Sequence, residues 1–545
     1  MEVLLSDKNV YHWVSANDIH FRGYLQDRTG RVYRANDAIH LLANVRDFQL
    51  LEKLLNDYYG SYSFIINKDG FRCAAVDIAR SLPLFLSNDG SIISDSAELL
   101  RSKLGIACTD VDDFLMTSMT AMSFLIGNDT VYSEIKQLDL GQYVEVGKDT
   151  VSFNYYYRHL NEVKDRPIKD YYNQLTESAY AAFARIKEAI NNRPVVLSMS
   201  GGYDSRFVGC MLKNVGVNDV YCYSYGKAGN FEGIQAKKNA EALGFKWTFV
   251  EYDDSLVKKL LDEEGLKYLD SYETHDYSAY IQNYFAVRYL HEKGWFPKNA
   301  VFLTGLCGDM PTGEYVIKED QFKDFNIDTA SEHLYNLLFA RYSMIDLYQK
   351  EYTQKIKQML SMLPIKIKDY QSWTTATDAI YTGTSHVHAF MNMNHVHGFF
   401  GYEWLLPYWD KDILNVWYSI PAQYRYGQKL YANWLMEHIC KPYGLNTRKT
   451  DIGYPESKWK RKVMYLGGSV IMFICLNLGI VFRRSYDFHG WAPLEVLLFK
   501  QLEKRGMIHY NKASITNLLV RYCFQRRYGA DVVLKAHKNL RMPAI

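Results

Sequence analysis

The sequence lacks a strong net charge. Its 63 basic and 61 acidic residues leave a net charge of +2 over 545 residues. A balance this close to neutral supplies no global field that would attract nucleic acid, so no nucleic-acid partner is expected. The length exceeds the usual size of one hydrophobic core, which predicts two or three domains.

Cysteine pairs at metal-binding or disulfide spacing are also missing. The eight cysteines are scattered and none forms C-x-x-C, which argues against a zinc site or a disulfide framework and favours a reducing compartment. The first residues, MEVLLSDKNVYHW, lack the basic start and apolar stretch of a secretory signal. The cytoplasm is therefore the predicted location.

One long uncharged run is present. Residues 463–482 (VMYLGGSVIMFICLNLGIVF) are 20 residues without a charge, with KWKRK before them and two arginines after. This length is sufficient to cross a bilayer core. Because a serine, an asparagine and three glycines dilute the run, a buried helix or a helix on a membrane surface is favoured over a span. A membrane contact through 463–482 stays open.

The pattern of apolar residues divides the chain into two parts. Residues 1–155 carry short alternating runs, such as 62–66 and 142–146, separated by turn residues, which predicts an antiparallel β-rich domain. From about 165 to 545, the pattern predicts strands and helices that first alternate, followed by a mainly helical region after about 330. The expected elements are a helix over 168–192, strands at 195–199, 220–225 and 247–251, and helices from 204 and over 231–243. This alternation predicts a parallel sheet with helices on its faces. The expected fold is thus an α+β antiparallel sandwich followed by an α/β domain with a helical C-terminal part.

A polar stretch interrupts the apolar run VVLSMSGGYDSRFVGCML at 195–212. Gly201 and Gly202, expected to adopt positive φ in a tight turn, would gather backbone N–H groups at the start of a helix into an anion site. Ser200 and Ser205 add hydroxyl donors. Asp204 would repel a bare phosphate, so it implies a cation, for which Mg²⁺ is the best candidate. The stretch predicts a nucleotide and magnesium, although no Walker-type lysine follows the glycines.

Several motifs resemble one known family. Residues 200–205 resemble the S-G-G-x-D-S loop of ATP pyrophosphatases, and 304–309 (TGLCGD) resemble the second glycine-rich loop of the asparagine synthetase family. Further likenesses to that family lie at 60–64, 77–85, 93–100, 403–410 and 449–455. In this family a class II glutamine amidotransferase domain, which has an Ntn-hydrolase fold, precedes an ATP pyrophosphatase domain.

The resemblance implies a set of site residues. Asp204 and Asp309 would share the Mg²⁺, and Lys449 would contact the phosphate and the developing oxyanion. Glu403, the first residue of its motif, is carried over as a second catalytic residue. The remaining candidates are expected around ATP: Ser200, Gly201, Gly202, Ser205, Gly305 and Gly308 at the pyrophosphate, and the backbone of Ser198 and Tyr223 at the adenine.

Departures from the family pattern are equally informative. Glu2 stands where the family carries its glutaminase cysteine, so a degenerate domain without glutamine hydrolysis is expected. Leu306 replaces a polar or acidic residue and cannot accept a proton, and Leu405 replaces an arginine. Loss of the cysteine is similar to the branch of β-lactam synthetases and lasso peptide cyclases, whose nucleophile is an amine of the substrate.

The resemblance implies an ATP-dependent amide-forming ligase. A small-molecule or peptide carboxylate would be activated as its adenylate with release of pyrophosphate, and ammonia or an amine would then form the amide. The alternative is a catalytically silent scaffold of the same fold, or a membrane-associated binding protein. Four histidines, His386, His388, His395 and His397, are expected to line a pocket or pack rather than to bind a metal. The acid, the amine, the pathway and the oligomeric state are not indicated.

Overall fold

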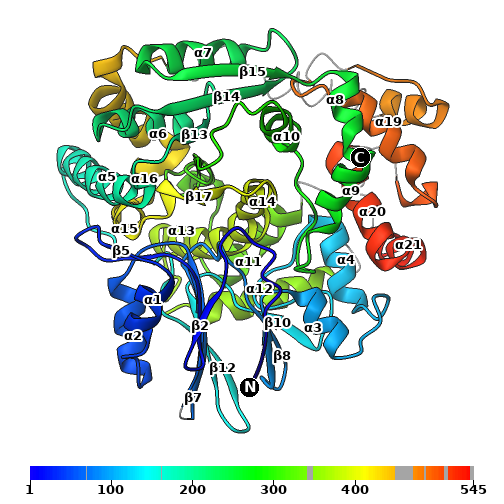
Figure 1. Ribbon diagram of the computed structural model, residues 1–545, viewed down its shortest axis with the longest axis horizontal. Helices are drawn as coiled ribbons and strands as arrows, with labels where there is room; N and C mark the ends of the chain where they lie inside the picture. Colours follow the sequence, from blue (N-terminus) through cyan, green and yellow to red (C-terminus); the bar gives the residue numbers. More distant parts are fainter. Residues whose placement is uncertain are drawn as a thin grey trace.

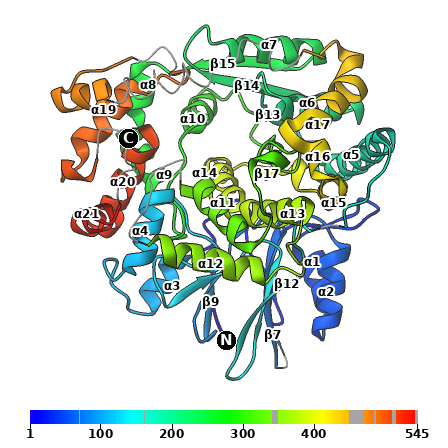
Figure 2. The same ribbon diagram turned by 180° about the vertical axis from the view of Figure 1, so that it is seen from behind.

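The computed structural model describes residues 1–68, 70–160, 162–339, 348–447, 470–483, 487–508 and 514–540. A β-sandwich forms the first part, a parallel sheet the second, and helices follow (Figure 1). Helices of the later part lie between the sandwich and the parallel sheet in both views (Figure 2). The mixed fold class expected from the sequence is confirmed at this level.

Two sheets face each other in the first part. The larger sheet has the order β12-β11-β7-β6-β3-β2 and the smaller β1-β9-β8-β10. In chain order these strands are β1 (Glu2–Leu4), β2 (Val14–Ala16), β3 (Ile19–Gly23), β6 (Tyr62–Lys68), β7 (Phe71–Val76), β8 (Phe85–Ser87), β9 (Ile92–Ser94), β10 (Ile135–Gln137), β11 (Gln142–Val146) and β12 (Val151–Tyr155); a short pair, β4 (Leu25–Gln26) and β5 (Val32–Tyr33), stands apart. All neighbours are antiparallel except β1 and β9, which run parallel.

Helices cover both outer faces of this sandwich. Alternate strand residues, such as Ile65, Val76 and Ile93, meet in a buried layer between the sheets. Helices α1 (Ala35–Leu42) and α2 (Phe48–Asp57) pack on the larger sheet. Helices α3 (Ala97–Lys103) and α4 (Asp113–Met122) pack on the smaller one.

The second part is built on a five-stranded parallel sheet with the order β15-β14-β13-β16-β17. Its strands are β13 (Val195–Ser198), β14 (Val220–Gly226), β15 (Lys246–Glu251), β16 (Val301–Leu303) and β17 (Glu403–Leu405). Helices α5 (Ile168–Ile190), α6 (Tyr203–Asn214) and α7 (Phe231–Leu243) pack on one face, and α10 (Tyr284–Glu292) on the other. The strand–helix alternation expected over 195–251 is confirmed within about two residues at each boundary.

This strand order fixes where a ligand site can form. The chain leaves β13 through α6 to reach β14 on one side, whereas β16 lies on the other side. Loops that leave neighbouring strands in opposite directions open a crevice at the carboxyl edge of the sheet. The two motif loops, 199–202 after β13 and 304–309 after β16, both lie at that edge.

The later part of the chain is mainly helical, as expected. Its α-helices are α8 (Asp254–Lys258), α9 (Glu263–Asp270), α11 (Ile327–Phe339), α12 (Gln349–Ser361), α13 (Tyr370–Tyr381), α14 (His395–Phe399), α15 (Lys411–Ser419), α16 (Ala422–Arg425), α17 (Lys429–Trp434), α19 (Ala492–Gln501), α20 (Ile515–Tyr528) and α21 (Ala530–Lys538). Two π-helices, η3 (Thr382–Phe390) and η7 (Leu435–Cys440), follow α13 and α17. Helices α20 and α21 return to the first part and pack beside α4 (Figure 1).

The uncharged run at 463–482 is described only from residue 470. Residues 470–478 form a helix whose Met472 and Leu476 are buried, while Ile474 and Leu478 are exposed. Among the helices of the described residues, none has the length and apolar character needed to cross a membrane.

Buried charges join the two parts of the chain. His388 of η3 lies with Nε2 3.2 Å from Asp139 Oδ1 and with Nδ1 3.2 Å from Asp276 Oδ2. Arg80 of the first part pairs with Asp276 at 3.1 Å. Burial alone would lower the pKa of His388, but its hydrogen bonds to the two carboxylates outweigh burial and raise that pKa above its ordinary value. The junction therefore favours a charged imidazole.

Replacement of His388 is expected to destabilise the protein in a pH-dependent way. A raised folded-state pKa contributes stability below the unfolded pKa, and that stability is lost as pH rises through the folded value. His388→Gln should lower the free energy of unfolding by about 3 kcal/mol at pH 6, with a smaller loss at pH 8.5. Denaturant unfolding at both pH values measures this difference. Exposed His40 offers the control His40→Gln, and an equal loss at both pH values for His388→Gln would contradict the prediction.

Candidate nucleotide and magnesium site

The first loop turns without unusual backbone angles. Gly202, the N-cap of α6, has φ −73°, and neither Gly201 nor Gly202 is among the residues with positive φ. The expected positive φ is therefore wrong. Space is tight at both positions instead: a Cβ atom on Gly201 would lie 3.3 Å from Gln235 Cβ, and one on Gly202 would lie 3.2 Å from Ser200 Oγ, so either neighbour would have to shift slightly.

Two serines hold this loop in shape. The Ser200 amide donates to Ser205 Oγ at 3.0 Å, the Gly202 amide donates to Ser200 Oγ at 3.1 Å, and the two hydroxyl oxygens lie 3.0 Å apart. No side chain in the described part of the chain caps α6. The first N–H groups of α6 thus remain able to bind an anion, as helix N-termini commonly do.

The second loop approaches the first without intervening side chains. A Cβ atom on Gly305 would lie 3.0 Å from the Asp204 carbonyl carbon, and one on Gly308 would lie 2.8 Å from Asp204 Cγ and 2.6 Å from Tyr408 Cζ. Between the two glycines, Cys307 adopts a left-handed φ of 65°. Contact between the loops therefore requires residues without a side chain at positions 305 and 308.

Two half-buried carboxylates face this contact. Tyr431 donates its hydroxyl to Asp204 Oδ1 at 3.0 Å, and Tyr315 donates to Asp309 Oδ2 at 3.3 Å. Burial, followed by the negative charges of both Asp204 and Asp309, raises the pKa of the Cys307 thiol well above its ordinary value. Both carboxylates therefore lie near the same side chain, which stays neutral at physiological pH.

This arrangement fits a magnesium ion that also binds phosphate. Within the described residues no group of three or more His, Cys, Asp or Glu side chains is arranged to hold a metal ion by itself. Two carboxylates with further ligands from a phosphate are the usual protein contribution to such a site. Asp204 and Asp309 supply this donor set, and the hydroxyls of Ser200 and Ser205 lie on the same loop as Asp204.

A tyrosine pair orders Asp204. The hydroxyl oxygens of Tyr408 and Tyr431 lie 2.6 Å apart, and both rings are buried. Burial, with the charge of Asp204 as a further cause, raises the pKa of both phenols well above the ordinary value. Tyr431 therefore remains a hydrogen-bond donor to the carboxylate. No local pattern in the sequence indicates this pair, because Asp204 and Tyr431 are 227 residues apart.

Arg206 is a second residue that sequence reasoning missed. It is fully buried; Nη2 donates to Gly201 O at 2.9 Å, and Nη1 donates to Leu445 O at 3.0 Å and Thr447 O at 2.6 Å. It thus ties the first loop to the segment that leads toward Lys449. Lys449 itself lies outside the described residues. The sequence does contain one signal for this residue, because Arg206 is a charged residue at the start of the otherwise apolar run 206–212 (RFVGCML).

The residues expected at the adenine, Ser198 and Tyr223, are only partly arranged for that role. Ser198 and Tyr223 are register partners on β13 and β14, but the Tyr223 carbonyl accepts the Met199 amide at 2.9 Å and is used by the sheet. The Tyr223 hydroxyl lies near Ser198 and Asn283, yet neither it nor Asn283 Oδ1 makes a well-directed hydrogen bond to any described residue.

Glu403 is not brought to this edge. It begins β17 opposite Val301, the first residue of β16, and so lies at the amino edge of the sheet. Its carboxylate pairs with Arg193 at 2.9 Å and with Arg34 of the first part at 3.1 Å. Glu403 therefore takes part in an ion pair that joins the two parts of the chain.

The remaining candidates lie apart from the two loops. Glu2 is exposed and pairs with Lys103 at 2.7 Å. His395 Nε2 lies 2.7 Å from Ser271 Oγ, and burial lowers its pKa to about 4. His397 stacks on Phe302, and burial lowers its pKa to about 3. With His388 in the ion-pair junction, the three histidines whose side chains are described pack separately, in line with the packing interpretation.

Replacement of Gly308 tests the contact between the loops. In Gly308→Ala the new methyl group would displace the Asp204 carboxylate or the Tyr408 ring, so Mg²⁺-dependent binding of ATP should weaken by about tenfold or more. Titration calorimetry with Mg·ATP measures the affinity. Gly506→Ala is the control, since a Cβ atom there meets no heavy atom within 4 Å. Equal affinity for both variants would show that the loops do not meet in solution as described.

Comparison with known proteins adds two findings. No curated protein matches the sequence. Among solved structures, glutamine phosphoribosylpyrophosphate amidotransferase from B. subtilis, complexed with ADP and GMP, matches with 10% identity and a TM-score of 0.18, over 54% of this chain and 63% of that one. At that score the match carries no weight for fold or function.

The sequence also matches a family model. The model of asparagine synthase covers residues 184–466, just over half of the 545 residues, and this range contains both motif loops and the sheet that presents them. The chain belongs to the asparagine synthase family, whose domain is that of an ATP-dependent carbon–nitrogen ligase.

Proposed function

We propose that the protein forms an amide from a carboxylate by way of an acyl-adenylate. A carboxylate oxygen attacks the α-phosphorus of ATP and pyrophosphate leaves; ammonia or an amine then attacks the acyl carbon, AMP leaves and one proton is released. The observation that carries this proposal is the contact between the loops at the carboxyl edge, where Asp204 and Asp309 lie around the same buried thiol.

Each group of the site has a distinct task in this proposal. The N-terminus of α6 and the hydroxyls of Ser200 and Ser205 bind the pyrophosphate oxygens. Asp204 and Asp309 would hold Mg²⁺, which when bound neutralises charge on the departing pyrophosphate. Tyr431 holds the Asp204 carboxylate in one orientation. Lys449, outside the described residues, is assigned to the developing oxyanion.

The nitrogen is proposed to come from ammonia or a substrate amine rather than from glutamine. Glu2 is exposed and ion-paired with Lys103, and a carboxylate does not replace a thiolate as acyl acceptor. Cys73, the first cysteine of the chain, is fully buried in β7, and burial raises its pKa far above the ordinary value. This supports placing the protein with the cysteine-less relatives. Because Leu306 cannot accept a proton, the amine would enter in its neutral form.

Loss of the Asp204 carboxylate should abolish this reaction. Asp204→Asn removes one proposed Mg²⁺ ligand and should lower the rate of pyrophosphate release by at least about 100-fold. The measurement is carboxylate-dependent formation of AMP and pyrophosphate with ammonium as the nitrogen donor. Glu403→Gln is the matched control, since its side chain lies at the opposite edge, and it should stay within about threefold of the unaltered protein.

Two outcomes of this assay would overturn the proposal. Formation of ADP and phosphate would exclude adenylation. Tight binding of Mg·ATP without turnover across a broad set of carboxylates would favour the silent scaffold. Glutamine in place of ammonium should give no amide and no glutamate, and glutamate production would contradict the assigned nitrogen source.

A second role, contact with a membrane surface, is favoured by one patch. Fourteen large apolar side chains of the described residues are exposed, and seven of them lie between 470 and 488. The exposed helical residues Val470, Ile471, Ile474 and Leu478 form one stripe at helical spacing. Basic residues precede this segment at 458–462 and follow it at Arg483. An apolar face flanked by positive charge is typical of helices that lie on anionic lipid.

Vesicle binding tests this second role. The protein should float with vesicles of phosphatidylglycerol and phosphatidylcholine at low salt, and Leu478→Asp should weaken the binding by about tenfold or more. Leu50→Asp is the control, because Leu50 is exposed on α2 in the first part. If both variants bind vesicles equally, or if the unaltered protein does not bind, the patch has no such role.

A further inference from the structure

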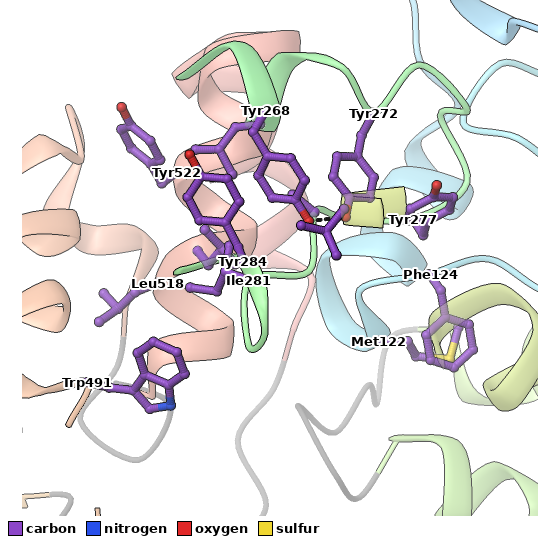
Figure 3. Packing of buried hydrophobic residues seen from close by; sticks show 14 of the residues in the cluster. Met122, Phe124, Tyr268, Tyr272, Tyr277, Ile281, Tyr284, Trp491, Leu518 and Tyr522 are labelled. Atoms are coloured by element: carbon purple, nitrogen blue, oxygen red, sulfur yellow. Dashed lines mark hydrogen bonds between the residues drawn. The ribbon is translucent and has the colours of Figure 1, made fainter. Parts of the chain in front are cut away.

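A pocket lies beside the carboxyl edge of the parallel sheet. Its walls come from the segment 277–282 before α10, the end of η3, Trp491 before α19 and the first turns of α20. Figure 3 shows Tyr277, Ile281 and Trp491 of these walls among other residues of the buried cluster to which they belong. Neither the motif loops nor the assigned site residues line this pocket.

The pocket is apolar and carries no charge among its described walls. Tyr277, Tyr280, Phe390 and Trp491 present aromatic rings, and Leu519 is among the aliphatic side chains. The polar groups there are uncharged hydroxyls and the amide of Gln282. A ligand ammonium or carboxylate placed among them would lose hydration without gaining a partner of opposite charge, whereas an aryl or alkyl group would gain burial.

One chain of contacts connects the pocket to the first motif loop. The ring of Tyr225, near the carboxyl end of β14, lies 6.3 Å between centroids from that of His489, which lies against Gln282 of the wall. Burial raises the pKa of the Tyr225 phenol well above its ordinary value, and the charge of Glu232 on α7 is a further cause. A Cβ atom on Gly201 would lie 3.6 Å from Glu232 Cα. The pocket and the first motif loop are therefore connected through Tyr225 and α7.

A second chain runs through the interior of the sheet. Asn283, directly after the pocket segment, lies near the Tyr223 hydroxyl, which in turn lies near Ser198 of β13.

The pocket wall at Trp491 is held in place by stacked rings. His489 lies 5.4 Å from Trp491 between ring centroids, and His489 Nε2 lies 3.1 Å from Gln282 Nε2. Gln282 and the segment 489–491 thus pack together in this part of the wall.

We propose that this pocket binds the uncharged aryl or alkyl part of the carboxylate substrate. Its carboxylate would extend toward the motif loops, where the reaction occurs, and the group in the pocket would be unchanged by it. This inference rests on the proposed function. The substrate class is a monocarboxylic acid with an apolar body, and a small dicarboxylate or a free acidic amino acid is a poor substrate.

Substrate preference and two pocket variants test the proposal. Pyrophosphate release by the full chain with Mg·ATP should favour 3-phenylpropionate over succinate by about tenfold or more in kcat/KM. Ala389→Trp fills the pocket and should raise KM for 3-phenylpropionate. Thr516→Arg places a cation in the half-buried wall and should shift the preference toward succinate by about tenfold. Thr353→Arg, at a half-buried position of α12 outside the pocket, should leave the preference unchanged.

A binding measurement separates this inference from the proposed function. Without ATP, 3-phenylpropionate should change the tryptophan fluorescence of the unaltered protein, and the change should be smaller in Trp491→Phe and absent in Ala389→Trp. Such binding without any pyrophosphate release would overturn the proposed reaction and leave the pocket in place. Pyrophosphate release with equal preference for both acids, unaltered by Ala389→Trp and Thr516→Arg, would overturn the pocket assignment alone. Absence of both binding and preference would also overturn it.

Discussion

The absence of side chains at Gly305 and Gly308 is the constraint on which the site depends. A single methyl group at position 308 would overlap the Asp204 carboxylate and the Tyr408 ring. Because β13 and β16 are neighbours, their loops leave the sheet at one place, and the close backbone approach brings the two acids to one buried thiol. Parallel strand order creates the crevice, and the glycines allow it to close around a small, highly charged group.

Buried polar side chains hold this arrangement in a single conformation. Arg206 donates hydrogen bonds to carbonyl oxygens of the first loop and of the segment at Leu445, and Tyr431 fixes one oxygen of Asp204. Groups of this kind are costly to bury unless they are paired, so each also penalises alternative packings of the loop. The site is therefore preorganised by residues that need not touch a substrate.

The sequence predicted what is local in this fold. The apolar run broken at 200–205 was sufficient to place a strand, a loop and helix α6, because each depends on neighbours in the chain. The prediction of positive φ at Gly201 and Gly202 is wrong. What limits these positions is the space left by Gln235 of α7 and by Ser200, not the backbone angles. The motif likeness predicts a catalytic role for Glu403, but the first residue of a parallel strand lies at the edge away from the ligand. Tyr431 and the apolar pocket depend on contacts across hundreds of residues, which periodicity does not reveal.

The packing of α20 and α21 against α4 has a consequence for biosynthesis. The apolar face of α4 and the smaller sheet belong to the first part of the chain, yet their cover includes residues beyond 515. At a translation rate of about 5–20 residues per second, that face stays uncovered on the ribosome for roughly 20–80 seconds. During this interval it is an exposed apolar surface, and the first part of the protein completes its folding only after residues beyond 515 have been made.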